Sequence, residues 1–207
     1  MKEEQLKYLE GTTTVGLACS DGVVFATDTR ATMGYLVASK RARKVYKITD
    51  NISVTVAGGV ADTQDLVNLL RAEAEYYLLR EGAPMDVRAA ARLIANVLHA
   101  YRLFPYIANL LVGGVGSGGR QLYFIDLDGS LTEELMVSTG SGSPIAYGVI
   151  ENEFREDMGT EEALPIAIKA VKSAMKRDIA TGNEIAVAVI TGAGFRELAP
   201  EEIKKLA

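Results

Sequence analysis

The sequence has one cysteine, one histidine and no tryptophan among its 207 residues. A lone cysteine cannot form an intrachain disulfide, and structural zinc sites take four Cys or His ligands, so both kinds of cross-link are excluded. The single histidine, His99, makes a Ser-His-Asp or Cys-His mechanism a poor candidate, and we expect it to be structural. Cys19 lies in an apolar run with nothing beside it that would lower its pKa, so we expect a buried, unreactive thiol.

Long hydrophobic runs and excess positive charge are also missing. No stretch reaches the roughly 20 apolar residues of a membrane span, and the first ten residues lack the apolar run of a secretory signal. The 22 Lys and Arg residues stand against 27 Asp and Glu residues, a net charge of -5 at pH 7. Because phosphate partners select for dense positive charge, we expect no nucleic-acid or membrane partner, and we expect a reducing compartment, the cytoplasm.

Hydrophobic periodicity predicts a blockwise order of strands and helices. A hairpin is expected at the start, followed by a strand ending at Gly58-Gly59 and by two amphipathic helices whose buried faces run from Leu66 to Tyr77 and from Val87 to Tyr101. Strands are then expected at residues 108–115, 121–126 and 131–138, helices after Ser143-Pro144 and from Thr160 as N-cap, and strands at 184–191 and 195–198.

This order differs from the strict alternation of strand and helix in parallel sheets. It predicts an α+β fold, a four-layer αββα sandwich of two antiparallel sheets flanked by helices. The length suits a single domain, here residues 12–207 behind a short polar segment. The glycine-rich run at 113–119 joins two strands and opens no helix, so we interpret it as a hairpin turn and not as a phosphate loop.

Three consecutive threonines follow Gly11. Threonine favours strands, so by itself this cluster indicates only the beginning of a strand. In the same way, Asp28 alone could be a turn residue, Lys44 one member of a solvated basic cluster, and Gly58-Gly59 a bend between strand and helix.

Taken together, these segments resemble the proteasome β subunits, a family of N-terminal nucleophile hydrolases, from Thr12 to about Thr191. The resemblance rests on separated motifs in family order, namely GTTTVG at 11–16, ATDTR at 26–30, RKV at 43–45, AGG at 57–59, GSGS at 140–143, and RD at 177–178 with TG at 181–182. The chain departs from the family pattern at Thr181, where serine is more common, and at Asn183, where an acidic residue is common. A hydroxyl is kept at Thr181, so we expect its hydrogen bonding to survive.

The resemblance implies a threonine endopeptidase that activates itself by cleavage between Gly11 and Thr12, with residues 1–11 as the propeptide. The freed α-amine, with an ordinary pKa of about 7.7–8.0, would accept the hydroxyl proton of Thr12, and no metal or cofactor would be needed. At Gly11, the missing side chain would let the backbone bend for the reaction. The catalytic residues implied are Thr12, Asp28, Lys44, Gly58, Ser141, Asp178 and Thr181.

Each implied residue has a role in that chemistry. Lys44 would stabilise the developing alkoxide, and Asp28 would hold Lys44 and keep it protonated. The backbone N–H of Gly58 would face the oxyanion of the tetrahedral intermediate. The remaining catalytic residues, Ser141, Asp178 and Thr181, would orient the amine and the attacking water.

A substrate pocket is implied as well. Its lining would be Ala31, Thr32, Ala42, Val56 and Val60, with Thr32 hydrogen-bonded to the backbone of an extended substrate. We expect no acidic or basic residue at its base and therefore cleavage after hydrophobic side chains.

The resemblance further implies an archaeal-type assembly. The chain would sit with α subunits and other β subunits in stacked heptameric rings, and a regulatory AAA ATPase would deliver unfolded polypeptides. Two alternatives stay open: a noncatalytic structural β subunit of the same ring, and a hydrolase of this fold that acts on small amides. A third alternative is an α-like scaffold. The last is disfavoured because no N-terminal helical extension precedes Gly11-Thr12.

Overall fold

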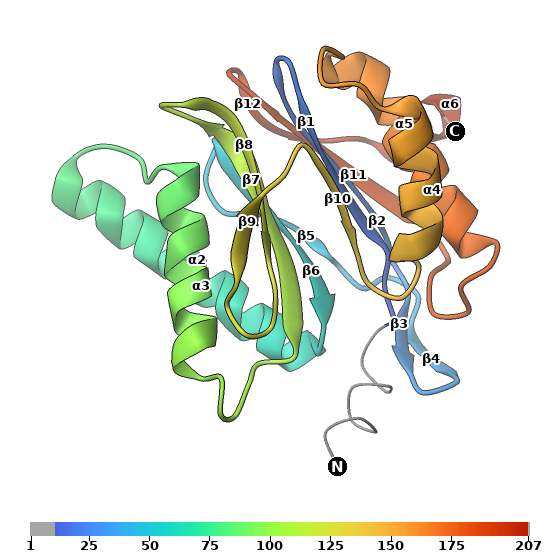
Figure 1. Ribbon diagram of the computed structural model, residues 1–207, viewed down its shortest axis with the longest axis horizontal. Coiled ribbons are helices and arrows are strands. Elements are labelled where there is room, and N and C mark those ends of the chain that lie inside the picture. Colours follow the sequence, from blue (N-terminus) through green and yellow to red (C-terminus); the bar gives the residue numbers. More distant parts are fainter. Residues whose placement is uncertain (1–10, 207) are drawn as a thin grey trace.

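The computed structural model describes residues 11–206. Two five-stranded antiparallel sheets pack face to face, and helices cover both outer faces (Figure 1). The fold prediction of a four-layer αββα sandwich is therefore confirmed. The predicted leader, residues 1–11, lies outside the described residues except for Gly11.

The first sheet has the order β10-β1-β2-β11-β12, and its outer face carries α4, α5 and α6. Their bounds are β1 Thr14–Cys19, β2 Gly22–Asp28, β10 Met136–Thr139, β11 Ile185–Thr191, β12 Gly194–Glu197, α4 Ser143–Glu153, α5 Thr160–Met175 and α6 Pro200–Leu206.

The second sheet has the order β5-β6-β7-β8-β9 and is covered by α2 and α3, while β3 and β4 form a separate hairpin. Their bounds are β5 Val45–Lys47, β6 Ile52–Gly58, β7 Ala108–Gly116, β8 Gly119–Ile125, β9 Leu131–Glu133, α2 Val60–Glu81, α3 Val87–Ala100, β3 Ala31–Met33 and β4 Leu36–Ser39.

Strand alternation sorts the apolar side chains into three core layers. In β2, Val24 and Ala26 join the layer beneath α4 and α5, whereas Val23 and Phe25 join the layer between the sheets. Room for the Phe25 ring comes from glycine, because a Cβ on Gly113 would lie 2.8 Å from it. Burial of such an aromatic ring contributes on the order of 2–3 kcal/mol, so Phe25 helps to hold the two sheets together.

The strand predicted at residues 131–138 is wrong in one respect. The structure divides it into β9, which pairs with β8 in the second sheet, and β10, which pairs with β1 in the first. The crossing takes two residues: the N–H of Glu134 donates to Leu122 O (2.9 Å), and Leu135 O accepts from the N–H of Ala18 (2.8 Å). An extended backbone on both sides of the crossing leaves no break in the sequence pattern that would indicate it.

Two details at helix ends also differ from the predictions. Tyr101 does not lie on a buried helix face: it is the C-cap of α3 and is exposed. At the start of α5, Thr160 is the first helical residue and not the predicted N-cap, which is Gly159. The capping acceptor is Asp21 in the β1–β2 turn, whose carboxylate accepts from the Thr160 backbone N–H (2.7 Å) and hydroxyl (3.0 Å). Such a long-range cap leaves no local sequence signal.

Strand register gathers several segments at one end of the sandwich. Thr14 of β1 is the partner of both Thr27 and Thr139, so the start of β1 lies beside the ends of β2 and β10. Three of the predicted catalytic residues, Thr12, Asp28 and Ser141, lie at these strand ends or within two residues of them.

Candidate active site

The three consecutive threonines have different surroundings. The hydroxyl of Thr13 is hydrogen-bonded to Thr181 Oγ1 (2.7 Å), and that of Thr14 to Thr139 Oγ1 (2.6 Å), and both side chains are fully buried. Thr12 instead lines a hollow, and its Oγ1 donates to the carbonyl oxygen of Gly11 at 2.5 Å. Of the three, Thr12 is therefore the one whose hydroxyl can meet a substrate.

Behind Thr12 lies a buried ion pair. Lys44 Nζ is 2.7 Å from Asp28 Oδ1 and 3.2 Å from the carbonyl oxygen of Gly11. The Asp28 carboxylate also accepts from the backbone N–H groups of Thr13 (2.9 Å), Arg30 (3.0 Å) and Gly182 (3.0 Å). The structure thus brings the predicted pair together beside the predicted nucleophile.

Burial lowers the pKa of Lys44 below its ordinary value, and the nearby Asp28 carboxylate opposes this with a smaller effect. Asp28 thus acts in the predicted direction, towards a protonated lysine, but burial outweighs it. As a result, Lys44 holds its proton less firmly than an exposed lysine does.

A second polar group adjoins the backbone of Thr12. Ser141 Oγ donates to Asp178 Oδ2 at 2.6 Å, and the hydroxyl of Thr181 donates to the same carboxylate oxygen. The amide N–H of Thr12 points to Ser141 Oγ at 3.4 Å, and this nitrogen would be the free amine after cleavage before Thr12. The structure therefore gathers all three residues, and threonine at position 181 supplies the hydroxyl expected there.

Sequence reasoning missed the role of Arg30. Its guanidinium donates to the backbone oxygen of Ile179 (2.7 Å) and to Asn183 Oδ1 (3.0 Å). A Cβ on Gly182 would lie 2.4 Å from the guanidinium carbon, and Asn183 has a positive φ of 72°. Arg30 thus fastens the loop that carries Asp178 and Thr181 to the end of β2. Arg30 belongs to the ATDTR motif, but only the fold shows what it holds.

Glycine is required at two positions by both conformation and space. Gly58 has φ +137° and a Cβ there would lie 2.1 Å from Ile107 O; Gly140 has φ +91° and a Cβ there would lie 2.1 Å from Thr12 O. Space is also limited at Gly11, because a Cβ there would lie 2.1 Å from Thr32 Oγ1. Close packing is thus one reason for glycine before Thr12, and the expected backbone bend stays a prediction.

The variant Gly140→Ala is expected to remove peptidase activity by displacing Thr12. Gly119→Ala is a matched control, because Gly119 has a similar φ of +88° but nothing within 4 Å of the added Cβ. Both substitutions carry the left-handed cost of about 1–2 kcal/mol, so both should lower the melting temperature by a few degrees. Only Gly140→Ala should also lower kcat/KM, by about 100-fold or more. Equal losses of activity in the two variants would contradict this assignment.

The hollow beside Thr12 has a volume of about 320 Å³. Its lining includes all the residues predicted for the substrate pocket, which are Ala31, Thr32, Ala42, Val56 and Val60. Lys44 and Gly58 line it too, together with Ser39 and Gln64, which the sequence did not indicate.

Basic side chains line this hollow beside the apolar ones, and the absence of charge at its base stays a prediction. Arg41 and Arg43 line this hollow in addition to Lys44. The Arg43 guanidinium is already bound to Val45 O (2.9 Å) and Glu197 (2.9 Å), whereas the exposed Arg41 adds a cation to the lining. The apolar residues named above still form one part of the wall, so cleavage after hydrophobic side chains stays a prediction.

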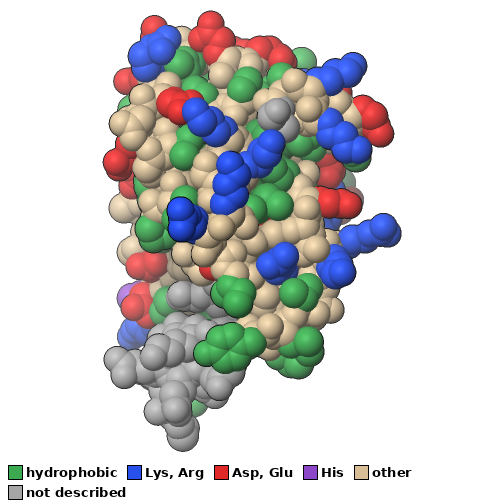
Figure 2. Space-filling model, turned by 90° about the vertical axis from the view of Figure 1, so that its right-hand side faces the viewer, with side chains coloured by type: hydrophobic (Ala, Val, Ile, Leu, Met, Phe, Trp, Pro, Cys, Tyr) green, Lys and Arg blue, Asp and Glu red, His purple; other side chains and the backbone are tan. Residues whose placement is uncertain are grey.

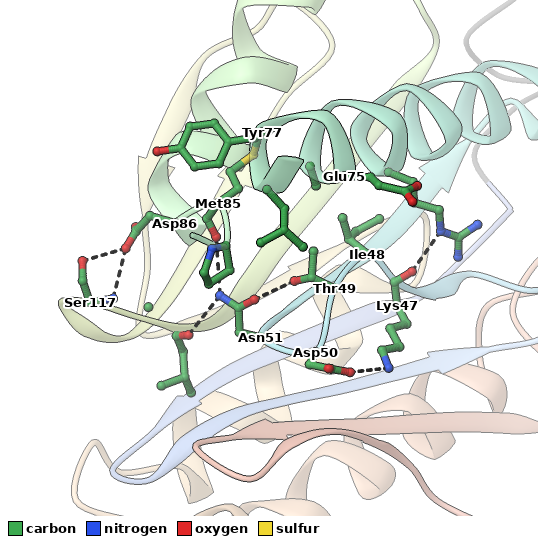
Figure 3. Close-up of a pocket in the computed structure, with 16 residues that line it drawn as sticks. Lys47, Ile48, Thr49, Asp50, Asn51, Glu75, Tyr77, Met85, Asp86 and Ser117 are labelled. Atoms are coloured by element: carbon green, nitrogen blue, oxygen red, sulfur yellow. Dashed lines mark hydrogen bonds and ion pairs between the residues drawn. The ribbon is translucent and has the colours of Figure 1, made fainter. Parts of the chain in front are cut away.

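A larger hollow of about 950 Å³ lies beneath α2, next to the β5–β6 turn (Figure 3). Several of its polar side chains make hydrogen bonds within the fold. The Asn51 amide contacts Met85 O and Val115 O, each at 3.4 Å, and Asp86 caps α3 while accepting from Ser117. None of the predicted catalytic residues lines this hollow. The candidate chemistry therefore belongs to the smaller hollow at Thr12.

Comparison with known proteins agrees with this geometry. The family model described as proteasome subunit matches residues 8–190. The chain belongs to the proteasome subunit family. It is 50% identical to "Proteasome subunit beta" of Ferroglobus placidus, over 97% of this chain and 96% of that protein. It is 49% identical to the protein of the same name from Methanothermobacter thermautotrophicus, over 95% of this chain and 94% of that protein.

Membership of the proteasome family, at this similarity to archaeal β subunits, makes the chain a β-type subunit of a multi-subunit proteasome core and a protease of the threonine type. Within residues 11–206, no three His, Cys, Asp or Glu side chains are grouped so that they could hold a metal ion. In the same part of the chain, no helix has the length and apolar character needed to cross a membrane.

Proposed function

We propose that this chain is a catalytic proteasome β subunit whose nucleophile is Thr12, exposed by autocatalytic cleavage of the Gly11–Thr12 bond. One observation carries the proposal: the Thr12 hydroxyl, the Lys44 ammonium and the Gly11 carbonyl converge at the hollow, with Lys44 Nζ 3.2 Å from Gly11 O and Thr12 Oγ1 2.5 Å from it. Nucleophile, cation and scissile carbonyl are thus neighbours before any cleavage.

Activation can proceed in two balanced steps. Thr12 Oγ attacks the carbonyl carbon of Gly11, the C–N bond breaks, and the hydroxyl proton ends on the departing nitrogen, so an ester and a free amine form. Water then hydrolyses the ester and leaves a carboxylate on Gly11 and the hydroxyl on Thr12. The Lys44 ammonium favours the negative charge that develops on the carbonyl oxygen in the first step.

Peptide hydrolysis would use the same groups with the new α-amine as base. The amine takes the Thr12 hydroxyl proton directly or through a water, and Thr12 Oγ attacks the substrate carbonyl carbon. The C–N bond of the substrate then breaks, the proton passes to the departing nitrogen, and an acyl-enzyme remains, which water hydrolyses. Gly58 is proposed to offer its N–H to the oxyanion. Ser141, held by Asp178 and Thr181, would orient the amine and the water that completes the reaction.

We further propose the family assembly for this chain: stacked heptameric rings with α subunits and other β subunits, supplied with unfolded polypeptides by a regulatory AAA ATPase in the cytoplasm. Exposed apolar side chains support subunit contacts. Figure 2 shows hydrophobic side chains at the end of the molecule where the β3–β4 hairpin lies, and Met33, Tyr35 and Leu36 there are 67%, 95% and 62% exposed. Side chains of this kind favour burial against a partner.

Intact mass of the chain after co-assembly with an α subunit tests the activation step, for the wild type and for Thr12→Ala. Loss of residues 1–11 in the wild type alone would support Thr12 as the nucleophile. Leader loss in both proteins would indicate processing from outside. Full length in both would favour the noncatalytic structural subunit, and a processed chain that hydrolyses only small amides would favour the small-amide hydrolase.

A further inference from the structure

The backbone N–H proposed to face the oxyanion belongs to Gly58, the last residue of β6, which is followed almost at once by α2. Gly58 has φ +137°, which side chains rarely allow, and a Cβ there would lie 2.1 Å from Ile107 O. The next N–H, that of Gly59, donates to the same carbonyl oxygen at 2.8 Å. Both glycines are therefore packed against the Ile107 carbonyl, and their position depends on where Ile107 lies.

Asp62 holds the other end of the Ile107 backbone. It lies in the first turn of α2, and its Oδ2 accepts from the Ile107 N–H at 2.8 Å. Because β7 begins only at Ala108, Ile107 lies just outside the strand. Two hydrogen bonds thus connect the Asp62 carboxylate to the backbone beside Gly58, the first to Ile107 N and the second from Gly59 N to Ile107 O.

The same contacts form a closed ring at the start of α2. Gly59 is the N-cap of this helix, and its carbonyl oxygen accepts from the Thr63 N–H at 2.9 Å. A Cβ on Gly59 would lie 3.3 Å from Asp62 Oδ2, so the carboxylate lies close to the N-cap backbone. The ring therefore runs from Gly59 through the first helical turn to Asp62, and back to Gly59 through Ile107.

We infer that Asp62 is a positioning residue for the oxyanion-binding N–H of Gly58, and that it acts through the Ile107 backbone. The inference rests on the proposed peptidase function of Thr12. Asp62 is not among the residues that line the hollow at Thr12, so its effect on the reaction would be indirect. An N–H group stabilises an oxyanion only when it already points to the place where the charge develops, and loss of one such donor lowers kcat by about 10²- to 10³-fold.

Asp65, one turn further along α2, offers a matched control. Its Oδ2 accepts from the Tyr106 hydroxyl at 3.0 Å, so it attaches the neighbouring residue of the same segment to the same helix. That bond holds a side chain, whereas the bond from Asp62 holds the Ile107 backbone. Loss of the Asp65 bond should therefore leave the packing of Ile107 against Gly58 and Gly59 in place.

The test measures kcat and KM for a fluorogenic peptide on the assembled particle, with kcat expressed per processed Thr12 as counted by intact mass. We expect Asp62→Ala to lower kcat by about 10- to 100-fold and to change KM by less than about threefold. Asparagine keeps a side-chain oxygen that can accept from Ile107 N–H, so Asp62→Asn should keep kcat within about threefold. Asp65→Ala should keep kcat within about twofold. Equal losses in Asp62→Ala and Asp65→Ala would overturn the inference, as would an unchanged kcat in Asp62→Ala.

Asp62→Glu replaces Asp62→Ala if the alanine variant does not assemble. Glutamate keeps the carboxylate but moves it by one methylene, so it should displace Ile107 without leaving its N–H free. The same fall in kcat at nearly constant KM is expected, by about tenfold. Wild-type kcat in Asp62→Glu would then count against the positioning role.

A peptide aldehyde and the peptide alcohol of the same sequence report on the oxyanion position directly. The aldehyde carbon can bond to Thr12 Oγ and place its oxygen where the oxyanion develops, whereas the alcohol has no carbonyl carbon to be attacked. We expect Asp62→Ala to raise the inhibition constant of the aldehyde by about the factor by which it lowers kcat/KM, and to leave that of the alcohol within about twofold. Equal weakening of both inhibitors would show a general change in the pocket and would contradict the inference.

Failure of the inference can be told from failure of the proposed function. If Thr12→Ala particles hydrolyse the peptide as fast as the wild type does, the proposed function fails. If hydrolysis depends on Thr12 but the Asp62→Ala particle has wild-type kcat and wild-type affinity for the aldehyde, only the positioning role of Asp62 is wrong.

Discussion

Replacing Thr12 by alanine is expected to lower peptide hydrolysis by about 10⁴-fold or more, because the attacking oxygen is removed. Thr12→Ser should keep activity within about a factor of ten, since it keeps that oxygen. For Thr12→Ala, the measurement needs a correctly exposed N-terminus, so residue 12 is placed behind a removable fusion instead of its own leader. The readout is kcat/KM for a fluorogenic peptide on the assembled particle.

Thr13→Val and Thr14→Val are the matched controls for this first prediction. Their hydroxyls are bonded to Thr181 and Thr139 inside the fold, so their loss should cost about 1 kcal/mol each in stability and leave a measurable activity. If Thr13→Val or Thr14→Val eliminated hydrolysis while Thr12→Ala did not, the nucleophile would have to be reassigned.

Lys44→Met is expected to lower kcat/KM by about 100- to 1,000-fold with little change in stability. Removal of one partner from a buried ion pair ordinarily costs about 3–5 kcal/mol. Here the cost should be smaller, because three backbone N–H groups continue to donate to the Asp28 carboxylate. In addition, burial lowers the pKa of Lys44, so the folded protein already holds this charge at a cost. Methionine also fills much of the volume of the lysine stem.

Asp28→Asn is expected to lower stability much more than Lys44→Met does, although both residues belong to the same ion pair. The carboxylate accepts from Lys44 and from three backbone N–H groups, and an amide would turn an NH₂ group towards some of these donors. We expect a loss of about 3–5 kcal/mol in the free energy of unfolding, as well as lost activity. Melting temperature and kcat/KM, measured for both variants, separate the two cases. Equal destabilisation by both would show that the backbone donors do not support Asp28.

The pH dependence of peptidase activity gives a further test of the role of Lys44. Lys44 is positive only below its pKa, and burial lowers that pKa. If its charge is needed, activity falls on the alkaline side at a lower pH than the ordinary lysine value of about 10.4. Lys44→Arg should move this alkaline limb upwards, because arginine stays charged throughout the accessible range. An unchanged limb would mean that another group sets it.

The fold class could be predicted because it depends on repeated local patterns. Alternating apolar residues marked β1 and β2, and helical periodicity marked the buried faces of α2 and α3. The division of residues 131–138 between two sheets could not be predicted, because extended strands on both sides of Glu134 and Leu135 have the same pattern. The capping of α5 by Asp21 could not be predicted either, because Asp21 and Thr160 lie far apart in the chain.

For the site, the sequence by itself determined which side chains are available: a glycine before three threonines, one histidine, and acidic, basic and glycine motifs in a familiar order. Only the tertiary structure decided which threonine faces the hollow, that Lys44 reaches both Asp28 and the Gly11 carbonyl, and that Arg30 fastens the loop of Asp178. Those facts depend on contacts between residues far apart in the chain, such as Thr13 with Thr181 and Lys44 with Asp28. Local propensity cannot predict such contacts, because they form only when strand register and sheet packing bring the segments to one end of the sandwich.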